Sequence, residues 1–203
     1  MMFFEDTRSI GLIFWIVAAF LMINAAIVLL GAFTVDVVMI PDYVTDFRMY
    51  CLTVGIGSVV VAILYAMKAH KTMSKKNTRM EILRSYIMTV GLCTLLGDTF
   101  TGVAEYLYTD HPVDGMITTG ITIAIGIIVI LIAFVITNGK KGFLKKVIWA
   151  ILVISFVLMA LEALLPAENY WEYTEHVAHL IIATFMLVLI ADSDVRTEMG
   201  AKS

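Results

Sequence analysis

A segment with the residue types of a binding or catalytic site lies at residues 168–179, directly before the apolar run 180–191. It contains three carboxylates, two histidines and three aromatic side chains. On a helix, four of these side chains are three or four residues apart and share one face: Glu172, Glu175, His176 and His179. Because ionisable groups inside a bilayer are costly, such a stripe leading into an apolar helix indicates a site rather than a solvated surface.

The two histidines predict one chemistry for this segment, a metal site. His176 and His179 are placed so that both rings can reach one ion, and Glu175 would add an oxygen ligand. Imidazole and carboxylate ligands suit Zn, Mn or Fe(II), so the cofactor expected here is a divalent transition metal. The HxxH spacing is not specific, because no HExxH or ExxH motif accompanies it. Solvated acids at a helix start, where they favour the helix dipole, explain the same pattern.

The aromatic residues of the segment have two interpretations. Tyr170, Trp171 and Tyr173 can line a pocket whose rings hold an organic cation. Tyr and Trp are also enriched where helices leave the bilayer, as an interfacial belt. The sequence leaves both interpretations open.

A second polar stripe runs along the apolar segment 85–107. Small and polar residues recur there at spacings of three and four: Gly91, Thr94, Asp98, Gly102 and Glu105. At about 1.5 Å per residue, Asp98 lies roughly 20 Å from the inner end of this segment, in the outer half of a bilayer. Glu162 is an isolated carboxylate in the run 147–165. We expect Asp98, Glu105 and Glu162 to bind a substrate, proton or cation, because such carboxylates with nearby histidines build proton relays and cation transporters.

The composition indicates the elements that position these groups. Of 203 residues, 61% are hydrophobic and only 15% are charged, whereas soluble domains are about half apolar and a quarter charged. Apolar runs of roughly 18 residues or more span a bilayer. The expected fold is all-α, a single transmembrane domain over residues 1–203 with six helices in three hairpins. The spans are expected at about 10–33, 49–67, 85–107, 115–137, 147–165 and 174–191.

A few residues inside these spans predict how the helices pack. Asn24 is the polar residue of the first span, and a lone Asn in a membrane helix usually hydrogen-bonds to a neighbouring helix. Gly55 and Gly57 in the second span are small enough to let another helix approach closely.

The basic residues predict the orientation of the chain. Thirteen of the fourteen lysines and arginines fall on one side of the predicted spans, and only Arg48 falls on the other. By the positive-inside rule, the basic side faces the cytoplasm. We therefore expect a multi-pass protein of the cell membrane with both termini cytoplasmic and with the acidic loops outside.

These features favour an outward-accessible carboxylate and histidine site that binds a cation, a metal or a small polar substrate for transport. A membrane-embedded metalloenzyme is the alternative, with His176 and His179 as ligands and a Glu as acid or base. A non-catalytic helical subunit of a membrane complex is the third. Whether the chain is an enzyme stays open at this point. The expected partners are the lipid bilayer, a small cation or polar molecule, and a second copy or a membrane complex, but no nucleic acid.

Overall fold

The computed structural model describes residues 7–34, 43–74, 77–138, 142–167 and 170–201 and is helical throughout these ranges, apart from turns and an isolated bridge between Val44 and Thr109. Six helical segments are long and apolar enough to cross a membrane, as the sequence predicted. They are α1 (Thr7–Gly31), α2 (Phe47–Ser74), the continuous segment Arg79–Tyr108, α5 (Pro112–Asn138), α6 (Phe143–Glu162) and α7 (Tyr170–Ile190). A short helix, α8 (Ser193–Glu198), follows α7.

The third of these segments is not uniform. It consists of α3 (Arg79–Cys93), a π-helical turn η3 (Thr94–Asp98) and α4 (Thr99–Tyr108). The start of α3 is fixed by a capping box, in which Thr78 and Glu81 exchange side-chain and backbone hydrogen bonds.

Some helices end at other residues than the predicted spans, and for α2 the predicted end was set by charged residues. The helix α2 continues to Ser74, so Lys68 and Lys71 belong to it rather than to a connecting loop. Backbone hydrogen bonding does not stop where the apolar run stops, and long basic side chains can reach the interface from within a helix. The helix α6 ends at Glu162, before Pro166, because proline cannot continue a helix.

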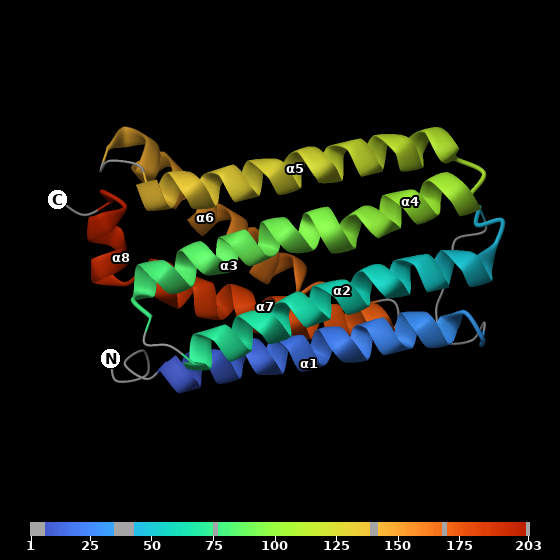
Figure 1. Cartoon of the computed structure of the whole chain (residues 1–203), viewed down its shortest axis with the longest axis horizontal. Helices are drawn as coiled ribbons and strands as arrows, with labels where there is room; N and C mark the ends of the chain where they lie inside the picture. Colours follow the sequence, from blue (N-terminus) through green and yellow to red (C-terminus); the bar gives the residue numbers. More distant parts are fainter. Residues whose placement is uncertain (1–6, 35–42, 75–76, 139–141, 168–169, 202–203) are drawn as a thin grey trace.

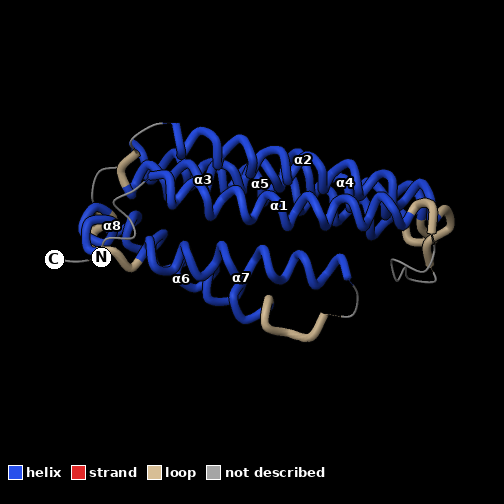
Figure 2. The backbone as a smooth tube through the Cα atoms, turned by 90° about the horizontal axis from the view of Figure 1, so that it is seen from below, coloured by secondary structure: helices blue, strands red, loops and turns tan. Residues whose placement is uncertain are grey.

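The helices form two layers (Figures 1 and 2). One layer contains α1 to α5, and the other contains α6 and α7, with α8 lying across one end. Within the first layer α1 packs on α2, and α5 packs on both α3 and α4. The second layer is joined to the first chiefly through α7 on α1. The predicted third hairpin therefore lies against the first hairpin more than against the second.

An aromatic cluster joins the two layers. The ring of Phe14 stacks on Tyr86 at a centroid distance of 6.1 Å and meets Phe185 edge-on at 5.8 Å. Tyr86 also lies 6.4 Å from Tyr65 and 6.0 Å from Phe156. These five rings come from α1, α2, α3, α6 and α7, so the cluster holds both layers together.

Glycines bring the helices of the first layer close together, as predicted. A Cβ atom at Gly57 would lie 2.6 Å from the carbonyl oxygen of Gly97, so α2 and η3 are in backbone contact. A Cβ atom at Gly55 would lie 2.5 Å from a side-chain carbon of Leu29 on α1. Both contacts depend on the absence of a side chain, which is how small residues serve membrane helices.

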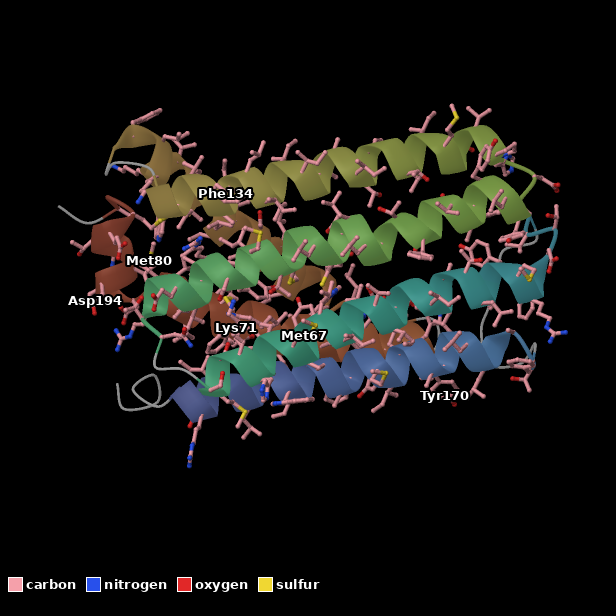
Figure 3. All side chains as sticks on the ribbon, viewed as in Figure 1. Met67, Lys71, Met80, Phe134, Tyr170 and Asp194 are labelled. Atoms are coloured by element: carbon pink, nitrogen blue, oxygen red, sulfur yellow. The ribbon has the colours of Figure 1, made fainter. Side chains whose placement is uncertain are left out.

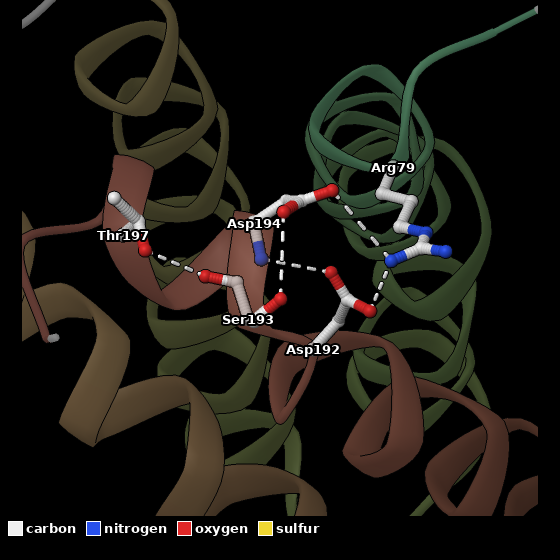
Figure 4. Close-up of polar contacts among 5 residues, drawn as sticks. All are labelled: Arg79, Asp192, Ser193, Asp194 and Thr197. Carbon is white, nitrogen blue, oxygen red and sulfur yellow. Dashed lines mark hydrogen bonds and ion pairs between the residues drawn. The ribbon is translucent and has the colours of Figure 1, made fainter. Parts of the chain in front are cut away.

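Polar contacts fix the end of the bundle at α8 (Figure 4). Arg79, at the start of α3, pairs with Asp192, which follows α7, and lies 3.7 Å from Asp194. The other carboxylate oxygen of Asp192 accepts a hydrogen bond from the backbone N–H of Asp194 and so caps α8. Because Arg79 and Asp192 come from different layers, this pair closes the bundle at that end.

Candidate functional site

The π-helical turn η3 displays Asp98 in the interior of the third span. The hydroxyl of Thr99 donates to the backbone carbonyls of Thr94 and Leu95, at 3.1 Å each, and so satisfies groups that the wider turn leaves free. The side chain of Thr94 interacts with the Asp98 carboxylate one helical turn away. Single π-helical turns inside α-helices are frequent at functional sites, so the backbone is consistent with Asp98 as a site residue.

Asp98 faces polar groups from two other helices. It interacts electrostatically with Glu175 and His179 of α7, and with Tyr65 of α2. Its own side chain is exposed although it lies far from either end of the span. An exposed carboxylate at this depth needs water, a cation or a protein group as its neighbour, because lipid is an unfavourable one.

The polar groups of α7 and α6 complete this cluster. The Nε2 atom of His179 lies 4.0 Å from Oε1 of Glu175, one helical turn away. Glu162, at the end of α6, interacts electrostatically with both of them, and His176 does so as well. The structure thus brings together five of the residues expected from the sequence, which we call the acidic cluster: Asp98, Glu162, Glu175, His176 and His179.

Glu105 is placed elsewhere. It lies on α4, which packs on α2 and α5, and it interacts electrostatically with Tyr50 of α2. Its backbone carbonyl accepts a hydrogen bond of 2.6 Å from Thr109 at the end of α4. Although Glu105 shares a predicted helical face with Asp98, its neighbours are those of the first layer.

Two of the three aromatic residues at the start of α7 lie on the surface of the bundle. Tyr170 and Tyr173 are exposed, and Figure 3 places Tyr170 at the periphery of the bundle. Trp171 is half-buried, and its backbone carbonyl accepts hydrogen bonds from Asn24 and Thr174. Exposed tyrosines at a helix start fit interfacial anchors.

Metal ligation finds limited geometric support. Within the ranges that the structure describes, no group of three or more His, Cys, Asp or Glu side chains is placed to hold a metal ion. His179 and Glu175 form a pair at 4.0 Å, which is fewer protein ligands than the three or four of known zinc sites. The acidic cluster as it stands suits a hydrated or organic cation, or protons, better than a directly ligated metal.

Sequence reasoning missed the polar residues that continue from the acidic cluster into the core. Asp98 interacts electrostatically with Cys93 and Tyr65, which in turn interact with the buried Tyr86. Tyr86 stacks on Phe14, and the ammonium group of Lys68 lies 5.2 Å from the centre of the Phe14 ring. Their signal in the sequence was weak, because tyrosine and cysteine occur in apolar helices for packing alone.

Comparison with known proteins adds no functional information. No protein-family model, curated protein or solved structure matches this chain.

Proposed function

We propose that this chain is a multi-pass protein of the cell membrane that binds a small cation, or a small polar substrate carrying positive charge, for transport. In this proposal all six apolar segments cross the bilayer, and both termini lie in the cytoplasm. The acidic cluster is then in the outer half of the membrane and opens outward. The orientation is supported by the placement of thirteen of the fourteen basic residues on one side.

One observation carries the proposal. Carboxylates from three separate spans interact electrostatically with one another, and Asp98 among them is exposed on a π-helical turn far from either end of its span. Like charges brought together repel, so such a cluster is stable only when protons or a cation neutralise part of the charge. Helices that served only for packing would not be stabilised by carboxylates placed near one another.

The binding test uses the purified chain in detergent and the substitution Asp98→Asn. Thermal unfolding is followed with and without Na⁺, K⁺, Mn²⁺, Zn²⁺ and a panel of organic ammonium compounds. A ligand that binds the folded state raises the midpoint by mass action. We expect a cation to stabilise the wild-type protein and the Asp98→Asn protein to lose that response. Asp110→Asn, an exposed acid in the turn after α4, is the matched control and should keep it.

The outcomes separate the candidate functions. Stabilisation by organic or monovalent cations supports the transport site, and uptake into vesicles containing the protein would extend it. Stabilisation by Mn²⁺ or Zn²⁺ alone, lost in His179→Ala, would support the metalloenzyme. Equal responses of wild type and Asp98→Asn would remove Asp98 from any site.

The orientation is tested by cysteine labelling of intact cells. The native Cys51 and Cys93 are buried and are expected to stay unlabelled. A cysteine replacing the exposed Val113, at the start of α5, should react with an impermeant reagent from outside. A cysteine replacing the exposed Glu198, in α8, should react only after the cells are opened. Labelling of both from outside would contradict the proposed topology.

A further inference from the structure

A second polar feature lies at the opposite end of the bundle from the acidic cluster. Between α2 and α3 the described residues line a cavity of about 500 Å³, which we call the α2–α3 pocket. Figure 3 shows Lys71 and Met67 along α2, with Lys71 nearer to the end where α8 lies. The pocket is not part of the acidic cluster, because none of its lining residues belongs to that cluster.

The polar part of the pocket carries positive charge. Lys68, Lys71 and Arg84 line it together with Ser85. Lys68 is only 7% exposed, and its ammonium group donates to the hydroxyl of Ser85. An ammonium group has three N–H donors, so this bond leaves two for another acceptor.

The acids near these cations do not neutralise them. Glu81 also lines the pocket, but its carboxylate accepts the backbone N–H of Thr78 at 2.7 Å in the capping box of α3. Among the described residues, no ion pair joins Lys68, Lys71 or Arg84 to a carboxylate. A buried ammonium group without a counter-charge is costly in a membrane protein, so an anion from outside the chain would be stabilising there.

One end of the pocket is mostly apolar. Leu64 and Met67 on α2, and Met88 and Leu92 on α3, line it on the side toward the middle of the membrane. Met67 is 63% exposed, so this side is open along the helix surface. The pocket is therefore charged at the membrane surface and apolar toward the membrane interior, which is the polarity of a lipid molecule.

We propose that the α2–α3 pocket binds a phosphate group, and that the source favoured by its apolar side is an anionic phospholipid. The phosphate accepts hydrogen bonds from Lys68, Lys71 and Arg84, since charge-assisted bonds to phosphate are the strong ones that these residues form. An acyl chain lies along Met67 and Leu92. Basic pockets between membrane helices bind anionic head groups in this manner.

The experiment measures thermal unfolding of the protein after lipid removal in a neutral detergent. Three probes are added separately: inorganic phosphate, short-chain phosphatidylglycerol, and phosphatidylcholine with the same acyl chains. We expect phosphatidylglycerol to raise the unfolding midpoint, and the other two to do so little. Lys68→Met, which keeps length and burial but removes charge, should weaken the response to phosphatidylglycerol about fivefold in concentration. Lys146→Met, an exposed lysine on α6, is the matched control and should respond as wild type.

Each outcome decides between the sources of phosphate. A response to inorganic phosphate that Lys68→Met abolishes, with no response to lipid, would overturn the lipid assignment in favour of a soluble phosphate compound. Equal responses to phosphatidylglycerol and phosphatidylcholine, which both carry a phosphate, would overturn the assignment to an anionic lipid. A Lys68→Met protein that responds to phosphatidylglycerol as the wild type does would overturn the phosphate site. If Lys68→Met does not fold, Lys71→Gln and Arg84→Gln carry the same test, because neither side chain is buried.

Discussion

Asn24 donates a hydrogen bond of 2.7 Å from its side-chain amide to the backbone carbonyl of Trp171. This bond connects α1 to the first turn of α7, the helix that carries Glu175 and His179. Asn24 is buried, and the carbonyl that it meets lies near the start of a helix, where α7 packs on α1. The bond therefore helps to hold the second layer in the position that forms the acidic cluster.

Replacing Asn24 should loosen this contact without unfolding the bundle. Hydrogen bonds between membrane helices contribute about 0.6 kcal/mol on average and up to ~1.7 kcal/mol. We expect Asn24→Leu to lower the free energy of unfolding by about 1 kcal/mol, measured by SDS titration in mild detergent with tryptophan fluorescence. Met22→Leu, at an exposed position of the same helix, should have little effect. Equal stability of Asn24→Leu and wild type would show that the bond contributes nothing net.

The backbone contact between α2 and η3 should be sensitive to a single methyl group. In Gly57→Ala the new Cβ would lie 2.6 Å from the Gly97 carbonyl oxygen, and backbone cannot move aside as a flexible side chain can. Overpacking of this kind costs about 1–3 kcal/mol. Gly120→Ala is the matched control, because a Cβ there meets nothing within 4 Å. Since alanine favours helices over glycine, Gly120→Ala should be neutral or slightly stabilising. The two variants are compared in the same SDS titration, and equal midpoints would contradict the close contact.

The stability of the α8 end should depend on pH through Asp192. The hydrogen bond from Arg79 holds the pKa of Asp192 below its ordinary value, against a smaller opposing effect of burial. A carboxyl whose pKa is lowered by folding stabilises the protein above its unfolded pKa, about 4, and loses that contribution as pH falls through the folded value.

Asp192→Asn tests this dependence because asparagine can still cap α8 but carries no charge. We expect the variant to be less stable than wild type at neutral pH and the difference to shrink as pH falls below about 4. The unfolding midpoint is measured across that range. Asp46→Asn is the control, since Asp46 also accepts a backbone N–H, from Met49, but does not pair with Arg79. If the difference in unfolding midpoint between Asp192→Asn and the wild type were the same at all pH values, the charge of the Asp192 carboxylate would not be its cause.

The acidic cluster predicts different effects for two glutamates that the sequence grouped together. Glu162 interacts with Glu175 and His179, whereas Glu105 interacts with Tyr50. On the proposed function, Glu162→Gln should weaken binding of the stabilising cation about tenfold, or ~1.4 kcal/mol. Glu105→Gln should leave the affinity unchanged. Calorimetric titration measures both, and the reverse order would place the binding site on α4.

The helical class was predictable because it depends on a strong local signal. Each apolar run is long enough to span a bilayer, and this requirement does not depend on which helices become neighbours. The hydrogen bond of Asn24 was predictable for the same reason, since a lone amide in a membrane helix needs a partner. The identity of its partner, the carbonyl of Trp171, was not predictable, because it depends on how the two layers pack together.

The parts that were missed depend on contacts distant in sequence or on backbone geometry without a residue signature. Nothing in the residues 94–98 distinguishes a π-helical turn from α-helix, so the setting of Asp98 was not foreseen. Helical spacing placed Glu105 on the same face as Asp98, but two residues on one helical face need not contact the same neighbouring helix. Asp98 interacts with residues of α7, whereas Glu105 interacts with a residue of α2. The predicted span 49–67 ended just before Lys68 because that residue is charged, whereas Lys68 is buried on α2.

The π-helical turn also constrains how the chain can change in length. Removing one residue between Cys93 and Thr99 would let the segment close into α-helix with little rotation of α3 against α4, because the five residues of the wide turn advance the chain about as far around the axis as roughly four α-helical residues do. Each side is anchored by its own glycine: a Cβ at Gly91 would meet the Gly126 carbonyl oxygen at 3.1 Å, and one at Gly102 would meet the Thr119 backbone nitrogen at 2.7 Å. Both glycine contacts can survive that deletion, whereas removing a residue from the α-helix between either glycine and the turn would rotate that glycine away from α5 by about 100°. A relative that is one residue shorter between Gly91 and Gly102 is therefore expected to lack the π-helical turn and to keep both contacts with α5.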